Sequence, residues 1–146
     1  KGVKVAVVNA GKPLPMLSHV GLLPQKIKSN KDYKIKGRNL RERKKLVDDV
    51  KYLEQAGVFS IVLEATSFDA VEDILKHSKV PIIGIGASVN CDGQILVTED
   101  LLGFFDKVPK FVKKYANLKK QIIKAIGNYA KDVRSRKFPT KQNIYN

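Results

Sequence analysis

The feature that most constrains the fold is an apolar run that ends abruptly in a carboxylate. Residues Phe59 to Leu63 have the sequence Phe-Ser-Ile-Val-Leu, and Glu64 follows directly, before Ala-Thr-Ser. A run of this length predicts a fully buried strand of a parallel α/β sheet. Such folds place their chemistry at the carboxyl ends of the strands. Glu64 is therefore our first candidate for a general base, and the alternative is a structural acid that holds a neighbouring loop.

Strands and helices are predicted to alternate around this run. Helices are expected from Leu40 to Ala56, with Gly57 as C-cap, and from an N-cap at Ser67 to His77. In the second helix we expect the inward-facing residues to be Phe68, Val71, Ile74 and Leu75. Further strands are expected over Val3–Val8, Pro13–Val20, Val80–Gly86 and Gly93–Val97. This alternation with continuous apolar strands predicts a parallel sheet in an α/β fold.

The segments outside this alternation have a different character. Residues 25–38 are polar and aperiodic, which predicts a long loop that is functional or mobile. Toward the C-terminus we expect a short helix over residues 109–116, a longer one capped by Asn117, and a frayed tail beyond Lys137. We expect a single domain over 1–146, with β/α units to residue 108 and C-terminal helices and tail over 109–146.

Charge and composition bear on the partners. Lys and Arg number 28 against 14 Asp and Glu, a net charge of +14, which favours anionic partners. The excess is mostly Lys on predicted helix faces, without Arg interleaved with aromatics, so we interpret it as a solvated surface and not as a nucleic-acid interface. Cys91 is the only cysteine and no apolar run approaches about 18 residues. A reducing, cytoplasmic setting without a membrane partner is therefore expected.

Three further positions have a functional and a structural interpretation each. Lys4, among apolar neighbours, either meets an anion inside a barrel or is a charge on an edge strand. His19 follows a short apolar run and either acts on a substrate or holds a turn. The Gly84-Ile-Gly86 segment lacks the third glycine and the following helix of a dinucleotide site, so its glycines more plausibly allow a close backbone approach.

Taken together, the motifs resemble the ketopantoate hydroxymethyltransferase family. His19-Val-Gly-Leu-Leu-Pro-Gln25 resembles the family's HxGLTPQ segment, and Tyr33-Lys-Ile-Lys-Gly-Arg38 resembles its YKVQGR. The remaining similar segments are Ile61-Val-Leu-Glu64, Ile83-Gly-Ile-Gly-Ala87, Cys91-Asp-Gly-Gln-Ile-Leu-Val97, and the C-terminal region with Pro109-Lys-Phe-Val112 and Phe138-Pro139. Six motifs in the same order cover most of the chain.

The resemblance implies a (β/α)₈ TIM barrel of the phosphoenolpyruvate/pyruvate superfamily. It implies transfer of a hydroxymethyl group from 5,10-methylenetetrahydrofolate to 3-methyl-2-oxobutanoate, with Mg²⁺ as cofactor, giving 2-dehydropantoate for pantothenate and coenzyme A synthesis. Glu64 falls on the family's proton acceptor, Lys4 on its substrate-binding lysine and His19 on its active-site histidine. The partners implied are the keto acid, the folate and further copies in a homo-oligomer.

Several departures from the family accompany this resemblance. The family chain is longer on the N-terminal side, where its magnesium-binding aspartates lie, so this chain supplies roughly the C-terminal half of a barrel and no metal ligand. Ala6 stands at the position of a further metal-associated Glu, and Ser88 where a Gly is usual. Thr66 and Ser67 replace a usual Val-Pro pair. The rival hypothesis is a non-catalytic, degenerate half-barrel that acts as a partner subunit or binds anions.

Overall fold

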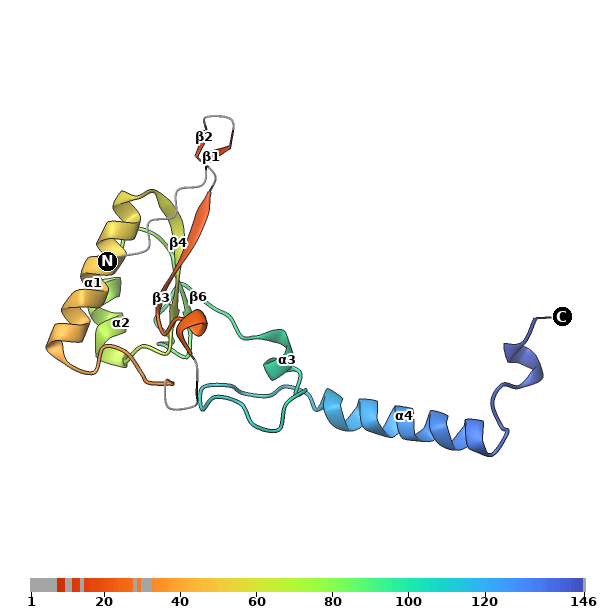
Figure 1. The fold of residues 1–146 in the computed structure, drawn as a ribbon. Helices are drawn as coiled ribbons and strands as arrows, with labels where there is room; N and C mark the ends of the chain where they lie inside the picture. Colours follow the sequence, from red (N-terminus) through yellow and green to blue (C-terminus); the bar gives the residue numbers. More distant parts are fainter. Residues whose placement is uncertain (1–7, 10–11, 14, 28, 30–32, 146) are drawn as a thin grey trace. The chain divides into compact units, whose positions relative to one another are not determined.

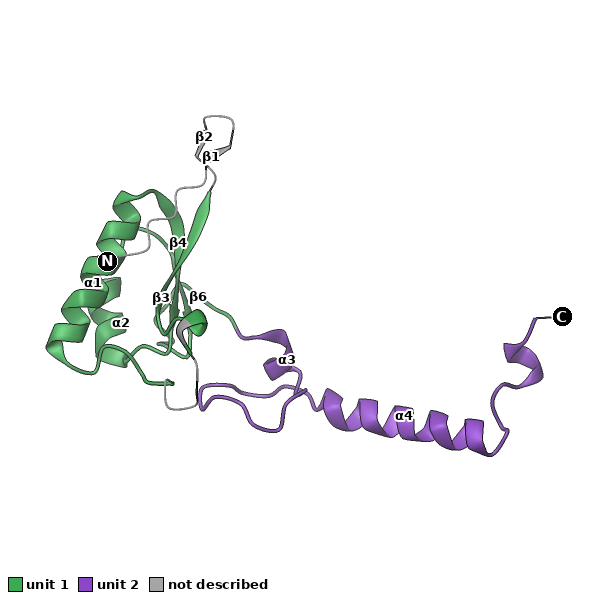
Figure 2. Cartoon of the chain, in the orientation of Figure 1, with its two compact units in different colours: residues 1–95 green, residues 96–146 purple. Residues whose placement is uncertain are grey.

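The computed structural model of the 146-residue chain describes residues 8–9, 12–13, 15–27, 29 and 33–145 (Figure 1). The chain divides into two compact units, residues 1–95 and residues 96–146 (Figure 2). Unit 1 contains the main sheet and unit 2 the C-terminal helices. The division falls after Ile95, and the expectation of a single domain with an internal boundary after residue 108 stays a prediction.

A four-stranded parallel sheet forms the centre of unit 1. Its strands are β3 (Met16–Gly21), β4 (Val58–Glu64), β5 (Ile82–Ile85) and β6 (Gly93–Gln94). They lie in the order β3-β4-β5-β6, which is also their order along the chain. The predicted parallel sheet is therefore confirmed. β6 is shorter than expected, although the N–H of Ile95 still donates to the carbonyl of Gly84 at 3.0 Å.

Helices α1 (Leu40–Gln55) and α2 (Phe68–Leu75) connect these strands and lie on the same side of the sheet (Figure 1). Asn39 caps α1, because its side chain accepts the N–H of Glu42 at 2.9 Å. Gly57 follows the C-terminal end of α1 with φ +85°, as expected of a C-cap glycine. The core between helices and sheet has fully buried side chains from all of them: Ile61, Leu63, Val50, Val71, Ile74 and Ile82.

One predicted core residue is wrong. Phe68 is 59% exposed, whereas Val71 and Ile74 are buried as predicted. The buried stripe of α2 is centred on Ala70, Val71 and Ile74. At 3.6 residues per turn, Phe68 lies roughly 110° around the helix from the centre of this stripe. The aromatic ring therefore points away from the sheet.

The N-terminal residues form a separate small sheet. β1 (Val8–Asn9) pairs antiparallel with β2 (Lys12–Pro13). The predicted strand Val3–Val8 falls mostly outside the described residues. Lys4 and Ala6 also lie outside them.

Unit 2 departs most from the sequence-based expectation. It contains α3 (Thr98–Leu101), α4 (Leu118–Arg134) and the short 3₁₀ helix η3 (Lys141–Asn143). The helix expected over residues 109–116 is wrong, because this segment folds back on α3: the N–H of Tyr115 donates to the carbonyl of Leu101 at 2.8 Å. Neither α3 nor η3, which lies in the tail expected to be frayed, was predicted.

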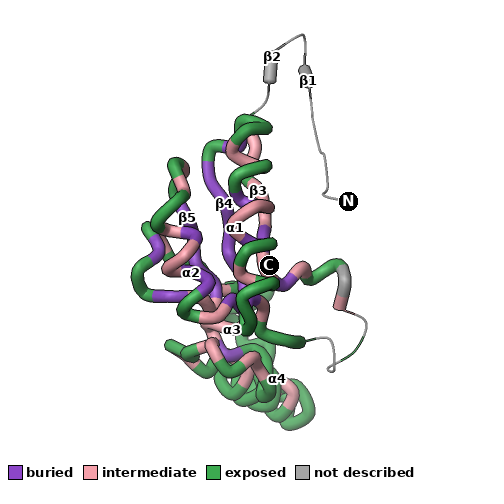
Figure 3. Tube along the Cα trace, turned by 90° about the vertical axis from the view of Figure 1, so that its left-hand side faces the viewer, coloured by how far each residue is buried: buried purple, intermediate pink, exposed green. Residues whose placement is uncertain are grey.

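The long helix α4 begins as predicted, with the Asn117 side chain accepting the N–H of Lys120 at 3.2 Å. No residue of α4 is buried, and Figure 3 shows the helix largely exposed. In the part of the chain that the structure describes, no helix combines the length and apolar character needed to cross a membrane.

Candidate active site

The candidate site lies on the face of the sheet opposite α1 and α2. Side chains alternate between the two faces along a strand, so Ile61 and Leu63 of β4 pack toward the helices while Val62 and Glu64 point the other way. His19 of β3 is in register with Val62 and Gly21 with Glu64, so the imidazole shares the face of the carboxylate. The fold thus brings together two residues that sequence analysis had considered separately.

His19 and Glu64 form a close pair. Nε2 of His19 lies 3.1 Å from Oε2 of Glu64, with the two side chains 30% and 10% exposed. Nε2 itself is buried and makes no aligned hydrogen bond within the described residues. The pair is therefore held at ion-pair distance.

The environment of Glu64 favours its protonated form. Burial raises the pKa of the carboxyl group above its ordinary value of 4.5, and the adjacent His19 acts in the opposite direction without cancelling the effect. Among the described residues, His19 is the sole ionisable side chain that influences this pKa. A carboxylate with a raised pKa binds a proton more strongly than an exposed one, as a general base requires.

The backbone around Glu64 is held from both sides. Its carbonyl oxygen accepts the N–H of Leu22 at 2.9 Å and the hydroxyl of Thr66 at 3.1 Å. The next residue, Ala65, has φ +46°, which is rare for a residue other than glycine. Its N–H donates to Ile85, in the neighbouring strand, at 2.9 Å. This strained turn is maintained by its neighbours and fixes the starting point of the carboxylate side chain.

Gly21 is required by the close approach of its strand to the same turn. It has φ +93°, and a Cβ atom there would lie 2.2 Å from the carbonyl oxygen of Glu64 and 2.7 Å from the Thr66 hydroxyl. A side chain at position 21 cannot be accommodated unless the backbone of the candidate base moves.

Part of the loop over residues 25–38, which the sequence predicted to be functional or mobile, supports the site through contacts that the sequence did not predict. η1 (Pro24–Lys26) begins this segment. Further along, the N–H of Lys36 donates to Ala65 at 2.9 Å, and the carbonyl of Lys36 accepts the N–H of Ser67 at 2.8 Å. Gly37 accepts the Ser67 hydroxyl through its carbonyl. The groups in these contacts are remote in sequence, and the two bonds of Lys36 involve backbone groups only, so residue types carried no signal for them.

The other glycine and cysteine positions have structural roles. A Cβ atom at Gly84 would lie 2.9 Å from the Gln94 side chain and 3.1 Å from Sγ of Cys91. The glycine therefore permits a close approach, as the sequence suggested. Cys91 is buried, and burial raises the pKa of its thiol, which disfavours the reactive thiolate. Ser88 is buried too, and its hydroxyl accepts the N–H of Asn90 at 3.1 Å.

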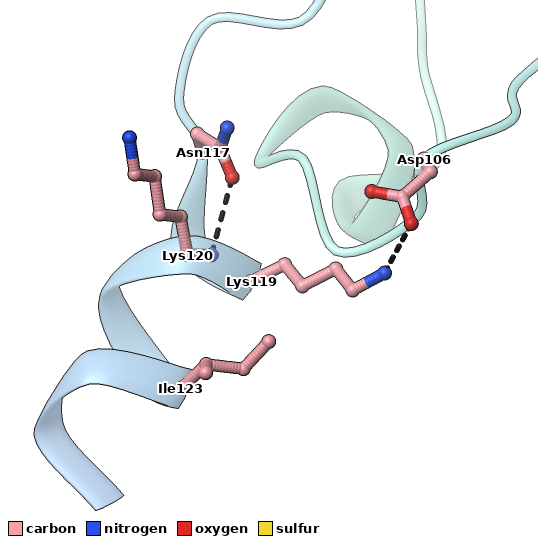
Figure 4. Close-up of a pocket in the computed structure, with 5 residues that line it drawn as sticks. All are labelled: Asp106, Asn117, Lys119, Lys120 and Ile123. Atoms are coloured by element: carbon pink, nitrogen blue, oxygen red, sulfur yellow. Dashed lines mark hydrogen bonds and ion pairs between the residues drawn. The ribbon is translucent and has the colours of Figure 1, made fainter. Parts of the chain in front are cut away.

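A pocket in unit 2 lacks comparable chemistry. It has a volume of about 290 Å³ and is lined by Asp106, Asn117, Lys119, Lys120 and Ile123 (Figure 4). Lys119 forms an ion pair with Asp106, so one of its two lysines is already neutralised. The described ranges contain no group of three or more His, Cys, Asp or Glu side chains that could hold a metal ion. The described residues do not by themselves form a magnesium site.

Comparison of the sequence with known proteins identifies its family. Residues 4–141 match the family described as ketopantoate hydroxymethyltransferase. The 3-methyl-2-oxobutanoate hydroxymethyltransferase of Nitrosopumilus maritimus is 45% identical over 141 residues, which cover 96% of this chain and 50% of the relative. The protein of the same name from Pelagibacter ubique is 50% identical over 132 residues, 90% of this chain and 50% of the relative.

A third relative of that name, from Staphylothermus marinus, is 43% identical over 140 residues, 96% of this chain and 51% of the relative. The chain thus spans about half the length of the curated relatives it matches. Matches of this extent cover nearly every element described above, including both residues of the His19–Glu64 pair. The chain belongs to the ketopantoate hydroxymethyltransferase family.

Proposed function

We propose that this chain carries the proton-abstracting part of a hydroxymethyltransferase active site. Glu64 removes the proton from C3 of 3-methyl-2-oxobutanoate, and the resulting enolate accepts a hydroxymethyl group from 5,10-methylenetetrahydrofolate to give 2-dehydropantoate. The observation that carries the proposal is the buried Glu64 carboxylate, with its raised pKa, 3.1 Å from His19 at the end of a parallel strand. The substrate follows from the name that the relatives share.

The chemistry of the first step agrees with this geometry. A proton on the carbon beside a ketone is weakly acidic, so its removal needs a well-placed base that binds protons firmly. The turn at Ala65 holds the base in place, since the flanking backbone is hydrogen-bonded to Leu22 and Ile85. Mg²⁺, when bound, would stabilise the enolate oxygen, and the resemblance places its ligands in the preceding part of the family chain. Lys4 as a contact of the substrate carboxylate remains part of the proposal.

We further propose that the sheet is part of a (β/α)₈ barrel. The strand order β3-β4-β5-β6 follows the chain, and α1 and α2 both lie on the same face of the sheet, as in a barrel wall. The face that carries Glu64 then faces the barrel interior, and β3 and β6 are the edges that the rest of the barrel would cover. Homo-oligomeric assembly and a cytoplasmic location are proposed from the resemblance alone.

The test is the loss of deuterium from 3-methyl-2-oxobutanoate labelled at C3, followed by NMR. It uses the polypeptide that carries this sequence at its natural length, with Mg²⁺ present. Glu64→Gln should slow the loss by about 10²- to 10⁴-fold, the range that general bases contribute. Glu99→Gln, in the exposed first turn of α3, is the matched control and should exchange like the wild type.

Two outcomes would contradict the proposal. Equal rates of deuterium loss with the wild type and with Glu64→Gln would show that Glu64 is not the base. No exchange by a folded wild-type protein would favour the alternative of a non-catalytic half-barrel that serves as a partner subunit or binds anions.

A further inference from the structure

We infer that His19 carries the proton between Glu64 and solvent, an inference that rests on the proposed enolisation. A base that takes a proton from carbon must lose it before the next turnover. Glu64 is 7% exposed and its side chain 10% exposed, so the carboxylate has little direct contact with water. The site therefore needs a group that reaches both the carboxylate and the solvent.

The position of His19 meets this requirement. Its Nε2 atom is buried and lies 3.1 Å from Oε2 of Glu64, yet 30% of the side chain is exposed in this chain. His19 lies two residues before the end of β3, on the side where the strands of the proposed barrel end and its interior opens to solvent. Because Nε2 is itself inaccessible, the exposed surface belongs to other atoms of the side chain. Nε2 has no competing hydrogen-bond partner among the described residues. The distance of 3.1 Å from Nε2 to Oε2 is short enough for a proton to pass between the two atoms.

The proton can be followed through the pair. The C3–H bond breaks, its electron pair remains in the enolate, and the proton moves to Oε2 of Glu64. An imidazole is a stronger base than a carboxylate, so neutral His19 accepts this proton at Nε2 and Glu64 becomes ionised again. The imidazolium then releases its Nδ1 proton to water, which leaves a neutral ring with its proton on Nε2. Exchange of the ring protons with water as the ring turns restores the starting tautomer, which is protonated on Nδ1.

No second ionisable group competes for this function in the part of the chain that the structure describes. His19 is the sole ionisable side chain there that influences the pKa of Glu64. The neighbouring side chains on this face, Val62 and Ile85, are apolar and buried. Among the described residues, the imidazole is thus the ionisable group that connects the carboxylate with solvent.

Chemical rescue tests the inference in the natural-length protein. His19→Ala should slow deuterium loss at least about tenfold, in line with the contribution of a proton-transfer group. Added imidazole should restore the rate in proportion to its free-base concentration, so rescue should rise with pH. Glu64→Gln should not respond to imidazole. His77→Ala removes an exposed histidine whose Nδ1 contacts the carbonyl of Asp73, and should behave as the wild type.

A rate in His19→Ala equal to that of the wild type would overturn the relay. A slow rate that no concentration of imidazole improves would also overturn it, because a purely structural histidine is not replaced by a small base.

A second measurement does not depend on turnover. His19 and His77 are the two histidines of this sequence, so their ring ¹⁵N signals can be followed separately through a pH titration. Replacing Glu64 with Gln should change the titration of His19 and leave His77 unaltered. An unchanged His19 would overturn the relay whatever the activity. A responsive His19 in a folded protein without deuterium loss would contradict the proposed reaction while supporting proton exchange within the pair.

Discussion

Three neighbouring strands end in the same unusual way, and this sets the geometry of the site. Gly21, Ala65 and Gly86, at or just after the ends of β3, β4 and β5, have φ values of +93°, +46° and +62°. Left-handed residues turn the chain sharply. The strand that carries Glu64 has the one residue of the three that is not glycine, so strain is concentrated beside the candidate base.

Substitution of Gly21 should show how tightly this region is packed. Gly21→Ala should destabilise the protein by about 2–4 kcal/mol, because the left-handed φ is unfavourable for alanine and its Cβ would meet the Glu64 carbonyl at 2.2 Å. Gly57→Ala is the matched control: φ is +85°, but no atom lies within 4 Å of the added Cβ. It should cost only about 1 kcal/mol. Urea unfolding measures the free energy of unfolding of both variants. Equal losses of stability in the two variants would contradict the close contact between position 21 and the Glu64 carbonyl.

The raised pKa of Glu64 predicts a trade between stability and activity. Folding disfavours the ionised carboxylate, so ionised Glu64 lowers the free energy of unfolding. This destabilisation is full at pH values above the folded-state pKa, and it disappears as the pH falls through that pKa toward 4.5. Glu64→Gln should therefore raise the melting temperature at neutral pH, and the difference from the wild type should shrink in acid. Deuterium loss by the wild type should fall in acid at a pH above 4.5, because the base must be ionised. A difference in melting temperature that is independent of pH would contradict this account.

At the scale of elements, the local signals in the sequence worked well where a side chain caps the start of a helix, as Asn39 does for α1 and Asn117 for α4. Apolar spacing and capping residues predicted α1 and the start of α4 closely. They failed at α2, where the stripe was extended to Phe68, and over residues 109–116, where backbone donors are used by α3 instead of within a helix. The exposure of Phe68 follows from its position around α2, whereas the conformation of residues 109–116 depends on backbone contacts with α3 that single residues do not encode.

The start of α1 depends on a reciprocal cap. Asn39 accepts the N–H of Glu42, and the Glu42 carboxylate accepts the N–H groups of Gly37 at 2.9 Å and Arg38 at 3.1 Å. Asn39→Ala should cost about 1 kcal/mol in urea unfolding. Asn39→Asp keeps an acceptor oxygen and should lose much less. Equal losses in the two variants would show that the cap does not support the helix.

Helix α4 can be strengthened without touching any neighbour. Gly127 lies in its interior, and a Cβ atom there meets nothing within 4 Å. Gly127→Ala should stabilise the helix by about 0.5–1 kcal/mol, seen as slower amide exchange along α4. Gly103→Ala is the contrasting variant, because φ is +74° and the added Cβ would lie 2.2 Å from the carbonyl oxygen of Ala116. Gly103→Ala should accelerate amide hydrogen exchange in unit 2.

At the scale of the whole molecule, sequence patterns predicted the parallel sheet, whereas the roles that the family motifs assign to Glu64, His19 and Lys4 stay predictions. Predicting that His19 pairs with Glu64 would have required the register between β3 and β4. The spacing of apolar residues along the sequence does not give that register. Lys4 lies outside the described residues, so its place in the site stays a prediction. Within the described residues of unit 1, β3 and β6 are the edge strands of the sheet and α1 and α2 lie on one of its faces, an arrangement that the proposed barrel explains.

The barrel proposal predicts that this chain is completed by the part of its relatives that it does not match. Residues 1–146 mixed with that part of the Nitrosopumilus maritimus relative should bind less apolar dye than the two separate pieces, because the open face and edges of the sheet become covered. The mixture should release deuterium from the labelled keto acid, and the same mixture made with Glu64→Gln should not. Dye binding equal to the sum of the two pieces would mean that they do not assemble. Assembly with reduced dye binding but no deuterium release would retain the barrel and reject Glu64 as its base.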